Sequence, residues 1–164
     1  MRILILCLLA TPLALAAVDP SHPALSAYAG VWKITKRDAP AGAKPDELNN
    51  QCASLGKYFV CEQTVNGQTG TLLIFIPTAK PGHFYTQNIS SDGRASSRGD
   101  LEVTGTQWIL SNTWNQGGRT TYYRTVNTFT GKNQIHFEQS ESTDNKNWKV
   151  TGSGDETRMG GVRR

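Results

Sequence analysis

Between Gly30 and about Thr157 the sequence repeats one pattern, in which a stretch of alternating apolar and polar residues is followed by a turn built on Gly, Asn, Asp or Pro. Alternation with a period of two residues is typical of β-strands that bury one face. Turns at regular spacing indicate that successive strands pair as antiparallel hairpins. About ten such stretches and no convincing long helix predict an all-β fold, a single up-and-down barrel, because closing the sheet removes its exposed edges.

The expected barrel domain spans residues 17–157. Before its first strand, residues 21–29 are expected to form a short helical turn, because Ser21 can cap a helix and Pro23 suits a first turn. Residues 38–46 are the longest expected loop, and Asn66-Gly67 is the strongest hairpin turn. The expected strands are 31–36, one on each side of Gly56, 69–76, 83–89, 95–103, 107–114, 119–130, 134–140 and 147–155.

Residues 1–16 have the features of a secretory signal peptide. The positive start Met1-Arg2 precedes an apolar core that is short for a membrane span, and small residues place the cleavage after Ala16, with Ala17 as the alternative. We therefore expect a periplasmic or secreted protein with no transmembrane segment after removal of the signal.

The net positive charge of the mature chain comes from residues at its C-terminal end. The sequence has 17 Lys and Arg against 13 Asp and Glu, and Arg158, Arg163 and Arg164 follow the last acidic residue. A nucleic-acid partner is not expected, because such binding needs a basic patch on the fold itself. Residues 158–164 are expected to be a flexible basic tail.

Cys52 and Cys61 are expected to form a disulfide. If Gly56-Lys57 is a two-residue hairpin loop, Leu55 faces Tyr58 and Cys52 falls opposite Cys61, where a disulfide is geometrically feasible. An exported chain favours the bridge, and the alternative is a pair of buried free thiols.

Large apolar residues recur on one face of the stretches 31–36, 107–114 and 134–140, since residues two apart along a strand point to the same side. We assign these faces to the barrel interior. Barrel mouths are common ligand pockets, and aromatic walls supply most of the contact area. The residues expected to contact a ligand there are Trp32, Trp108, Leu110, Trp114 and Phe137.

Arg124 lies in a stretch whose two faces are equally mixed. Tyr122 and Val126 share its face, whereas Tyr123 and Thr125 occupy the other. If the face of Arg124 points inward, its guanidinium must be paired inside the barrel or bind an anionic ligand; if it points outward, it is solvated. Arg124 is a candidate ligand-binding residue with both directions open.

Gly30-Val31-Trp32, at the head of the first strand and after a short helical segment, resembles the opening motif of the lipocalins and their calycin relatives. The chain looks most like small secreted bacterial proteins of unknown function with a lipocalin-like fold. The resemblance implies that Trp32 closes the barrel floor and that a basic residue near the last strand, Arg158 or Lys149, packs across its ring.

No catalytic motif was found, the histidines lack the spacing of metal ligands, and no cofactor or metal site is expected. The sequence favours an exported barrel that binds one small, largely apolar or amphipathic ligand in its lumen. The alternative is a protein-interaction or inhibitor module that acts through rim loops such as 38–46, with no luminal ligand. An enzyme is not expected.

The disulfide generates the first testable prediction. Reduction is expected to lower the free energy of unfolding by about 2 to 3 kcal/mol without abolishing the fold, because the bridge closes only a short loop. Urea titration with and without reductant measures the change. Two alkylatable thiols in the native, unreduced protein, seen by mass spectrometry, would contradict the bridge.

Overall fold

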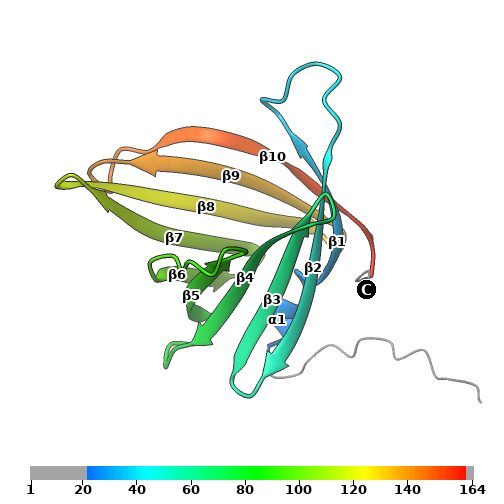
Figure 1. Cartoon of the computed structure of the whole chain (residues 1–164), viewed down its shortest axis with the longest axis horizontal. Helices are drawn as coiled ribbons and strands as arrows, with labels where there is room; N and C mark the ends of the chain where they lie inside the picture. The colour runs from blue at the N-terminus through cyan, green and yellow to red at the C-terminus, as the bar shows by residue number, and fades with distance from the viewer. Residues whose placement is uncertain (1–21, 162–164) are drawn as a thin grey trace, which may run out of the picture.

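Each alternating stretch of the sequence forms a strand, and the strands pair in chain order until the last closes on the first (Figure 1). The structure is a computed structural model and describes residues 22–161. This range contains no helix long and apolar enough to cross a membrane. The elements are α1 (Pro23–Ser26), β1 (Gly30–Lys36), β2 (Asp46–Leu55), β3 (Tyr58–Val65), β4 (Gln68–Pro77), β5 (His83–Ser90), β6 (Gly99–Thr104), β7 (Gln107–Gln116), β8 (Arg119–Gly131), β9 (Gln134–Ser142) and β10 (Lys149–Gly160).

The sequence-based expectation of an all-β, ten-stranded antiparallel barrel with a short helical turn is confirmed. The expected signal peptide, residues 1–16, and the proposed cap Ser21 lie outside the described residues. The hairpins have the expected turns, since Asn66 and Gly67 both adopt positive φ, at 52° and 77°, as a tight hairpin turn requires.

The register worked out from the Gly56-Lys57 turn is also confirmed. β2 and β3 pair with Leu55 opposite Tyr58 and Cys52 opposite Cys61, and the two cysteines form a disulfide. The bridge therefore joins neighbouring strands of the barrel wall.

Two expected boundaries were wrong. The stretch 95–103 becomes a strand only at Gly99, because residues 95–98 leave the sheet after a single bridge between Ile89 and Ala95. At the other end, β10 continues to Gly160, past the expected boundary at residue 157, so Arg158 belongs to the barrel and not to a tail. The reason is that Arg158 pairs directly with Trp32 across the β1–β10 seam.

Trp32 closes one end of the barrel through one contact at the edge of its ring and another over the face of the ring. Its indole Nε1 donates a hydrogen bond to the Tyr28 carbonyl, 2.9 Å away. The guanidinium carbon of Arg158 lies 4.3 Å from the centre of the Trp32 ring, and the same guanidinium donates to the carbonyls of Ala27 and Ala29. The last strand thus holds the short segment that connects α1 to β1.

Of the two basic residues that the lipocalin resemblance offered for this contact, Arg158 and not Lys149 stacks on Trp32. Gly30 makes the approach feasible. A Cβ at this position would lie 2.8 Å from the Gly160 carbonyl oxygen and 3.0 Å from a guanidinium nitrogen of Arg158, and the φ of 123° is one that other residues rarely adopt. The glycine of the Gly-x-Trp motif is therefore required by its own positive φ and by the backbone of β10, and it also leaves room for the arginine.

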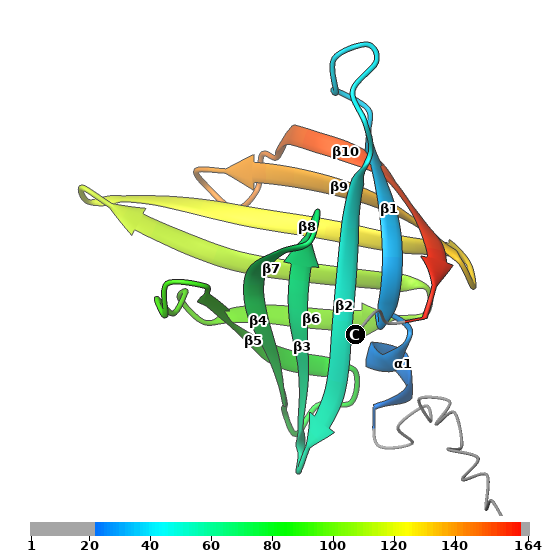
Figure 2. The same cartoon turned by 45° about the vertical axis from the view of Figure 1, so that its right-hand side comes forward.

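The apolar core gathers at the same end. Figure 2 shows α1 beside the start of β1, at the opposite end of the barrel from the β1–β2 loop. A cluster of buried side chains packs there, and Tyr28, Phe84 and Phe129 lie against it. The cluster comprises Leu25, Phe59, Cys61, Leu73, Phe75, Leu101 and Trp108. The α1 end is consequently filled, and room inside the barrel remains only toward the other end.

Replacing Arg158 by Met should destabilise the fold by about 2 to 4 kcal/mol, because it removes a cation–π contact and charge-assisted hydrogen bonds to two backbone carbonyls. Urea unfolding followed by circular dichroism measures the loss. Arg94→Met serves as the control, since the Arg94 side chain is 86% exposed and forms a surface ion pair with Asp92. Equal effects of the two substitutions would contradict a structural role for Arg158.

Candidate functional site

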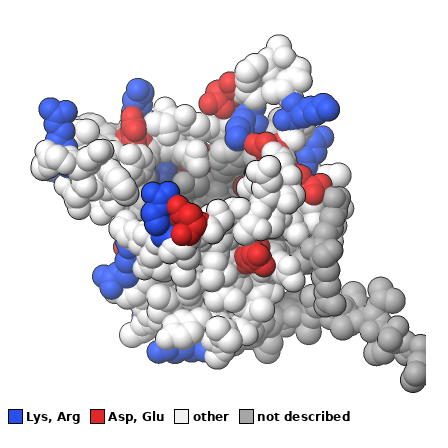
Figure 3. Space-filling model, viewed as in Figure 1, with Lys and Arg blue, Asp and Glu red and all other residues white. Residues whose placement is uncertain are grey.

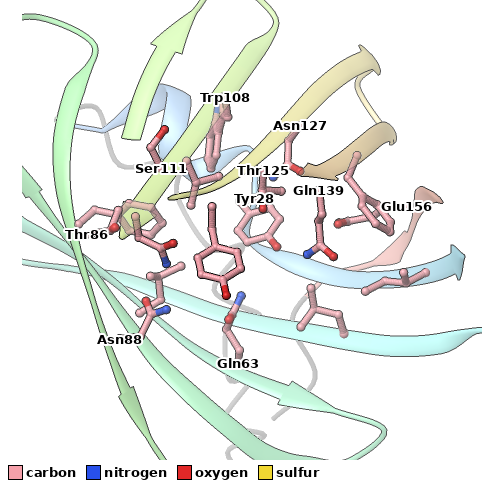
Figure 4. Close-up of a pocket in the computed structure, with 18 of the residues that line it drawn as sticks. Tyr28, Gln63, Thr86, Asn88, Trp108, Ser111, Thr125, Asn127, Gln139 and Glu156 are labelled. Carbon is pink, nitrogen blue, oxygen red and sulfur yellow. The ribbon is translucent and has the colours of Figure 1, made fainter. Parts of the chain in front are cut away.

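A cavity of about 400 Å³ lies inside the barrel above the filled end. Figure 3 shows the molecule hollowed on the face it presents, with charged side chains around the hollow. The cavity is lined by side chains from strands around the barrel and by Tyr28 (Figure 4). Its volume falls within the range of small-molecule sites.

The lining combines an apolar part with a belt of amides and hydroxyls. Phe75, Trp108 and Phe137 supply aromatic surface, and Ile34, Leu48, Leu73 and Leu110 supply aliphatic surface. The uncharged polar side chains are Gln63, Thr86, Asn88, Ser111, Asn112, Thr125, Asn127 and Gln139, beside the hydroxyls of Tyr28 and Tyr123. Such a lumen suits a ligand that has both an apolar body and polar groups.

Tyr28 projects into the cavity from the segment that Arg158 holds. Asn50, which is 0% exposed, donates from its amide to the Tyr28 carbonyl at 3.1 Å and accepts a hydrogen bond of 2.9 Å from Gln63. Burial, and to a lesser degree the negative charge of Glu156, raises the pKa of the Tyr28 hydroxyl above its ordinary value. Tyr28 is therefore a neutral hydrogen-bonding group fixed in position.

Glu156 is the buried acid of the lining. It lies on β10 directly between Ile34 of β1 and Ile135 of β9, and only 6% of its surface is exposed. Burial raises the pKa of its carboxyl to about 7. Its Oε2 is buried and accepts no hydrogen bond from any described residue. Figure 4 shows the side chain at one side of the cavity, near Gln139.

Lys36 is the other charged residue of the lining among residues 22–161, and it is already paired. Its Nζ lies 2.8 Å from a carboxylate oxygen of Asp46, and this contact raises the pKa of Lys36 and lowers the pKa of Asp46. Both side chains are partly exposed, so the pair lies at the open end of the cavity.

The structure brings together three of the residues expected to contact a ligand. Trp108, Leu110 and Phe137 line the cavity. Trp32 is fully buried and packs beneath the lining as part of the closed end. Trp114 shares the inward face of β7 but lies beyond the cavity, where it is 56% exposed and borders a shallow rim hollow together with Tyr123.

Arg124 points outward. Its neighbours Tyr123 and Thr125 both line the cavity, so the alternation of side chains along β8 places Arg124 on the outer face. There its guanidinium carbon lies 4.2 Å from the centre of the Trp148 ring. Of the two directions left open by the sequence, the structure adopts the outward one, and the luminal role considered for Arg124 is withdrawn.

Sequence reasoning missed the polar half of the site, namely Tyr28, Gln63 and Glu156. For Glu156 a signal was present in the sequence. Once Arg158 is placed across Trp32, the period of two along the last strand puts Glu156 on the same inward face. The sequence left both Arg158 and Lys149 as candidates for the contact with Trp32, and with a period of two these choices place Glu156 on opposite faces of the strand.

A second hollow, of about 540 Å³, lies outside the closed end. It is lined by Pro23 of α1, by the β6–β7 turn at Gly105 and by Lys132 between β8 and β9. Trp108 lines both hollows, so its ring stands between the lumen and this outer groove. The groove is thus a separate surface that any test of luminal binding must distinguish.

Fold and site together define a ten-stranded antiparallel barrel with an internal cavity closed at one end. No protein-family model and no curated protein sequence matches the chain. Among solved structures, the crystal structure of Rv2717c from M. tuberculosis is similar, with a TM-score of 0.50 and 14% sequence identity over 87% of this chain and 99% of that chain. At this identity the similarity shows a shared barrel fold alone.

Glu156 makes the stability of the protein depend on pH. Between its ordinary pKa of 4.5 and its folded pKa of about 7, the unfolded chain has released a proton that the folded chain retains, so stability falls as the pH rises through this window and then levels off. Glu156→Gln should remove the fall, which amounts to about 3 kcal/mol at most. Urea unfolding of both proteins at pH 5 and pH 8 measures it, and parallel pH profiles would contradict the buried acid.

Proposed function

We propose that this chain is a binding protein that holds one small ligand in the lumen of its barrel. The observation that carries the proposal is the cavity of about 400 Å³, which a filled barrel of this size would lack. The core cluster and the Trp32–Arg158 contact close one end, so a ligand enters and leaves at the other.

The chemistry of the lining refines the expected ligand. A purely apolar molecule would cover the amides of Gln63, Asn127 and Gln139 without giving them hydrogen-bond partners, at a cost of about 1 to 3 kcal/mol for each group left unpaired. An amphipathic ligand avoids this cost. Its apolar part would contact Trp108 and Phe137, and its polar part the amides.

We further propose that the protein works outside the cytoplasm as a lipocalin-like carrier or sensor without catalytic activity. The disulfide between Cys52 and Cys61 supports an oxidising compartment, in agreement with the signal-like residues 1–16. The contact of Arg158 across Trp32 supports the lipocalin-like assignment.

A protein-interaction role through the rim is the second candidate function, and exposed aromatic residues favour it. Trp114 and Tyr123 are 56% and 41% exposed, and both border a hollow of about 300 Å³ with Ser96 and Ser97. Aromatic side chains of this kind are enriched at binding surfaces. This role does not require the lumen, and a blocked lumen separates the two functions.

Luminal binding is tested with the neutral dye N-phenyl-1-naphthylamine and the variant Leu110→Trp. The added ring should occupy the cavity and weaken dye binding by about tenfold or more. Ile109→Trp is the matched control, because Ile109 is the next residue of β7 and points outward; it should bind the dye as the parent protein does. Fluorescence titration gives both affinities.

The control of folding is the melting temperature of the two variants. Saturable 1:1 binding that Leu110→Trp removes and Ile109→Trp preserves supports the proposal. Binding that neither variant affects places the dye in the outer groove beside α1, and no saturable binding at all leaves the lumen without a role; either result would overturn the proposed function.

A further inference from the structure

Glu156 is the one buried carboxyl among the residues that line the cavity in the described chain. An amide of nearly the same shape would serve as well for binding a neutral polar group and would cost less to bury, because a carboxyl loses its hydration and becomes charged near neutral pH. A carboxylate that is charged inside a protein normally has a partner of opposite charge. If the protein itself supplies no such partner, the ligand is the group that can supply it.

The groups that face Glu156 offer no such partner. β9 contributes Ile135 and Phe137, and β1 contributes Ile34. Lys36, further along β1, pairs with Asp46 at the open end.

On β10 itself, the nearest residue on the same face toward the closed end is Arg158. Its two terminal guanidinium nitrogens donate to the carbonyls of Ala29 and Ala27, its guanidinium lies over the Trp32 ring, and its buried Nε has no hydrogen-bond partner, so Arg158 makes no hydrogen bond to Glu156. Tyr28, the remaining titratable group near the carboxyl, is neutral at ordinary pH and carries no positive charge when it ionises.

Building on luminal binding as its function, we propose that the ligand carries a basic nitrogen, and that its ammonium group pairs with Glu156 while its apolar body lies against Phe137 and Trp108. Three observations support this assignment: Glu156 is 6% exposed, it is among the residues that line a cavity with aromatic walls, and its Oε2 has no hydrogen-bond partner in the described chain. The pair forms inside a low-dielectric lumen, where a charged hydrogen bond is stronger than at the surface.

The same charge distribution selects against acids. Apart from Lys36, which its ion pair with Asp46 neutralises, no described lining residue is basic. A carboxylate ligand would meet Glu156 as a like charge. The lumen should thus rank ligands of one shape in the order amine, neutral alcohol, acid.

Three probes of one shape test this order: 1-naphthylmethylamine, 1-naphthylmethanol and 1-naphthoic acid. Isothermal titration calorimetry on the full mature chain at pH 8 should show the amine binding about tenfold or more tightly than the alcohol, because a charged pair replaces a neutral hydrogen bond. The acid should bind most weakly.

Glu156→Gln should lower the affinity for the amine about tenfold or more, to that of the alcohol, and leave the alcohol unchanged. Glu138→Gln is the matched control, because it removes the same charge from the outward face of β9 and should change neither. Raising the pH from 5.5 to 8 should tighten amine binding to the parent protein, since Glu156 ionises in this window, and should not affect the variant.

The outcomes distinguish failure of the basic-nitrogen assignment from failure of luminal binding. The basic-nitrogen assignment would be overturned by equal affinities for the amine and the alcohol, or by an amine affinity that Glu156→Gln leaves unchanged. The luminal function would still stand in that case, provided that Leu110→Trp blocks binding. Failure of the dye to bind, or dye binding that Leu110→Trp leaves unchanged, would overturn the luminal function itself.

Discussion

The contact between Arg158 and Trp32 is the constraint on which the rest of the structure depends. It joins the last strand to the first, so it completes the barrel, and its hydrogen bonds to the carbonyls of Ala27 and Ala29 hold the segment that carries Tyr28 into the interior. Gly30 is needed at this point because any side chain would collide with the β10 backbone and with the arginine. The three-residue motif that opens the barrel is thus understood only together with a residue near its end.

Closure at one end determines where the cavity lies. Large apolar side chains pack around Leu25 and Phe75 at the α1 end, whereas toward the open end the strands present amides and hydroxyls to the interior. Amides occupy less of the lumen than aromatic rings would, and they remain wet or bind a ligand. The same sequence feature that reduces the core, a polar inward face near the strand ends, therefore creates the site. Glu156 lies within this arrangement as a buried acid whose burial lowers stability above pH 4.5, a cost that ligand binding can offset.

Much of this could be predicted from the sequence. The alternation and the turns identified the strands, and simple counting from Gly56 placed Cys52 opposite Cys61. Trp108, Leu110 and Phe137 were correctly placed in the interior. The expected start of β6 was wrong. Residues 95–98 are Ala, Ser, Ser and Arg, which are not typical strand formers, and after the single bridge at Ala95 they are held by contacts such as the hydrogen bond from the Ser97 hydroxyl to the Thr113 carbonyl.

What the sequence by itself determined is local: the number of strands, their hairpin register and, where one face is clearly apolar, the side that points inward. Only the tertiary structure decided the direction of Arg124, because both faces of β8 carry similar residues and the Trp148 ring that receives the guanidinium comes from a distant turn. It also decided that the lumen is open and that Glu156 is buried. Both properties depend on how side chains from strands all around the barrel fill the interior together, and a single stretch of sequence does not show this.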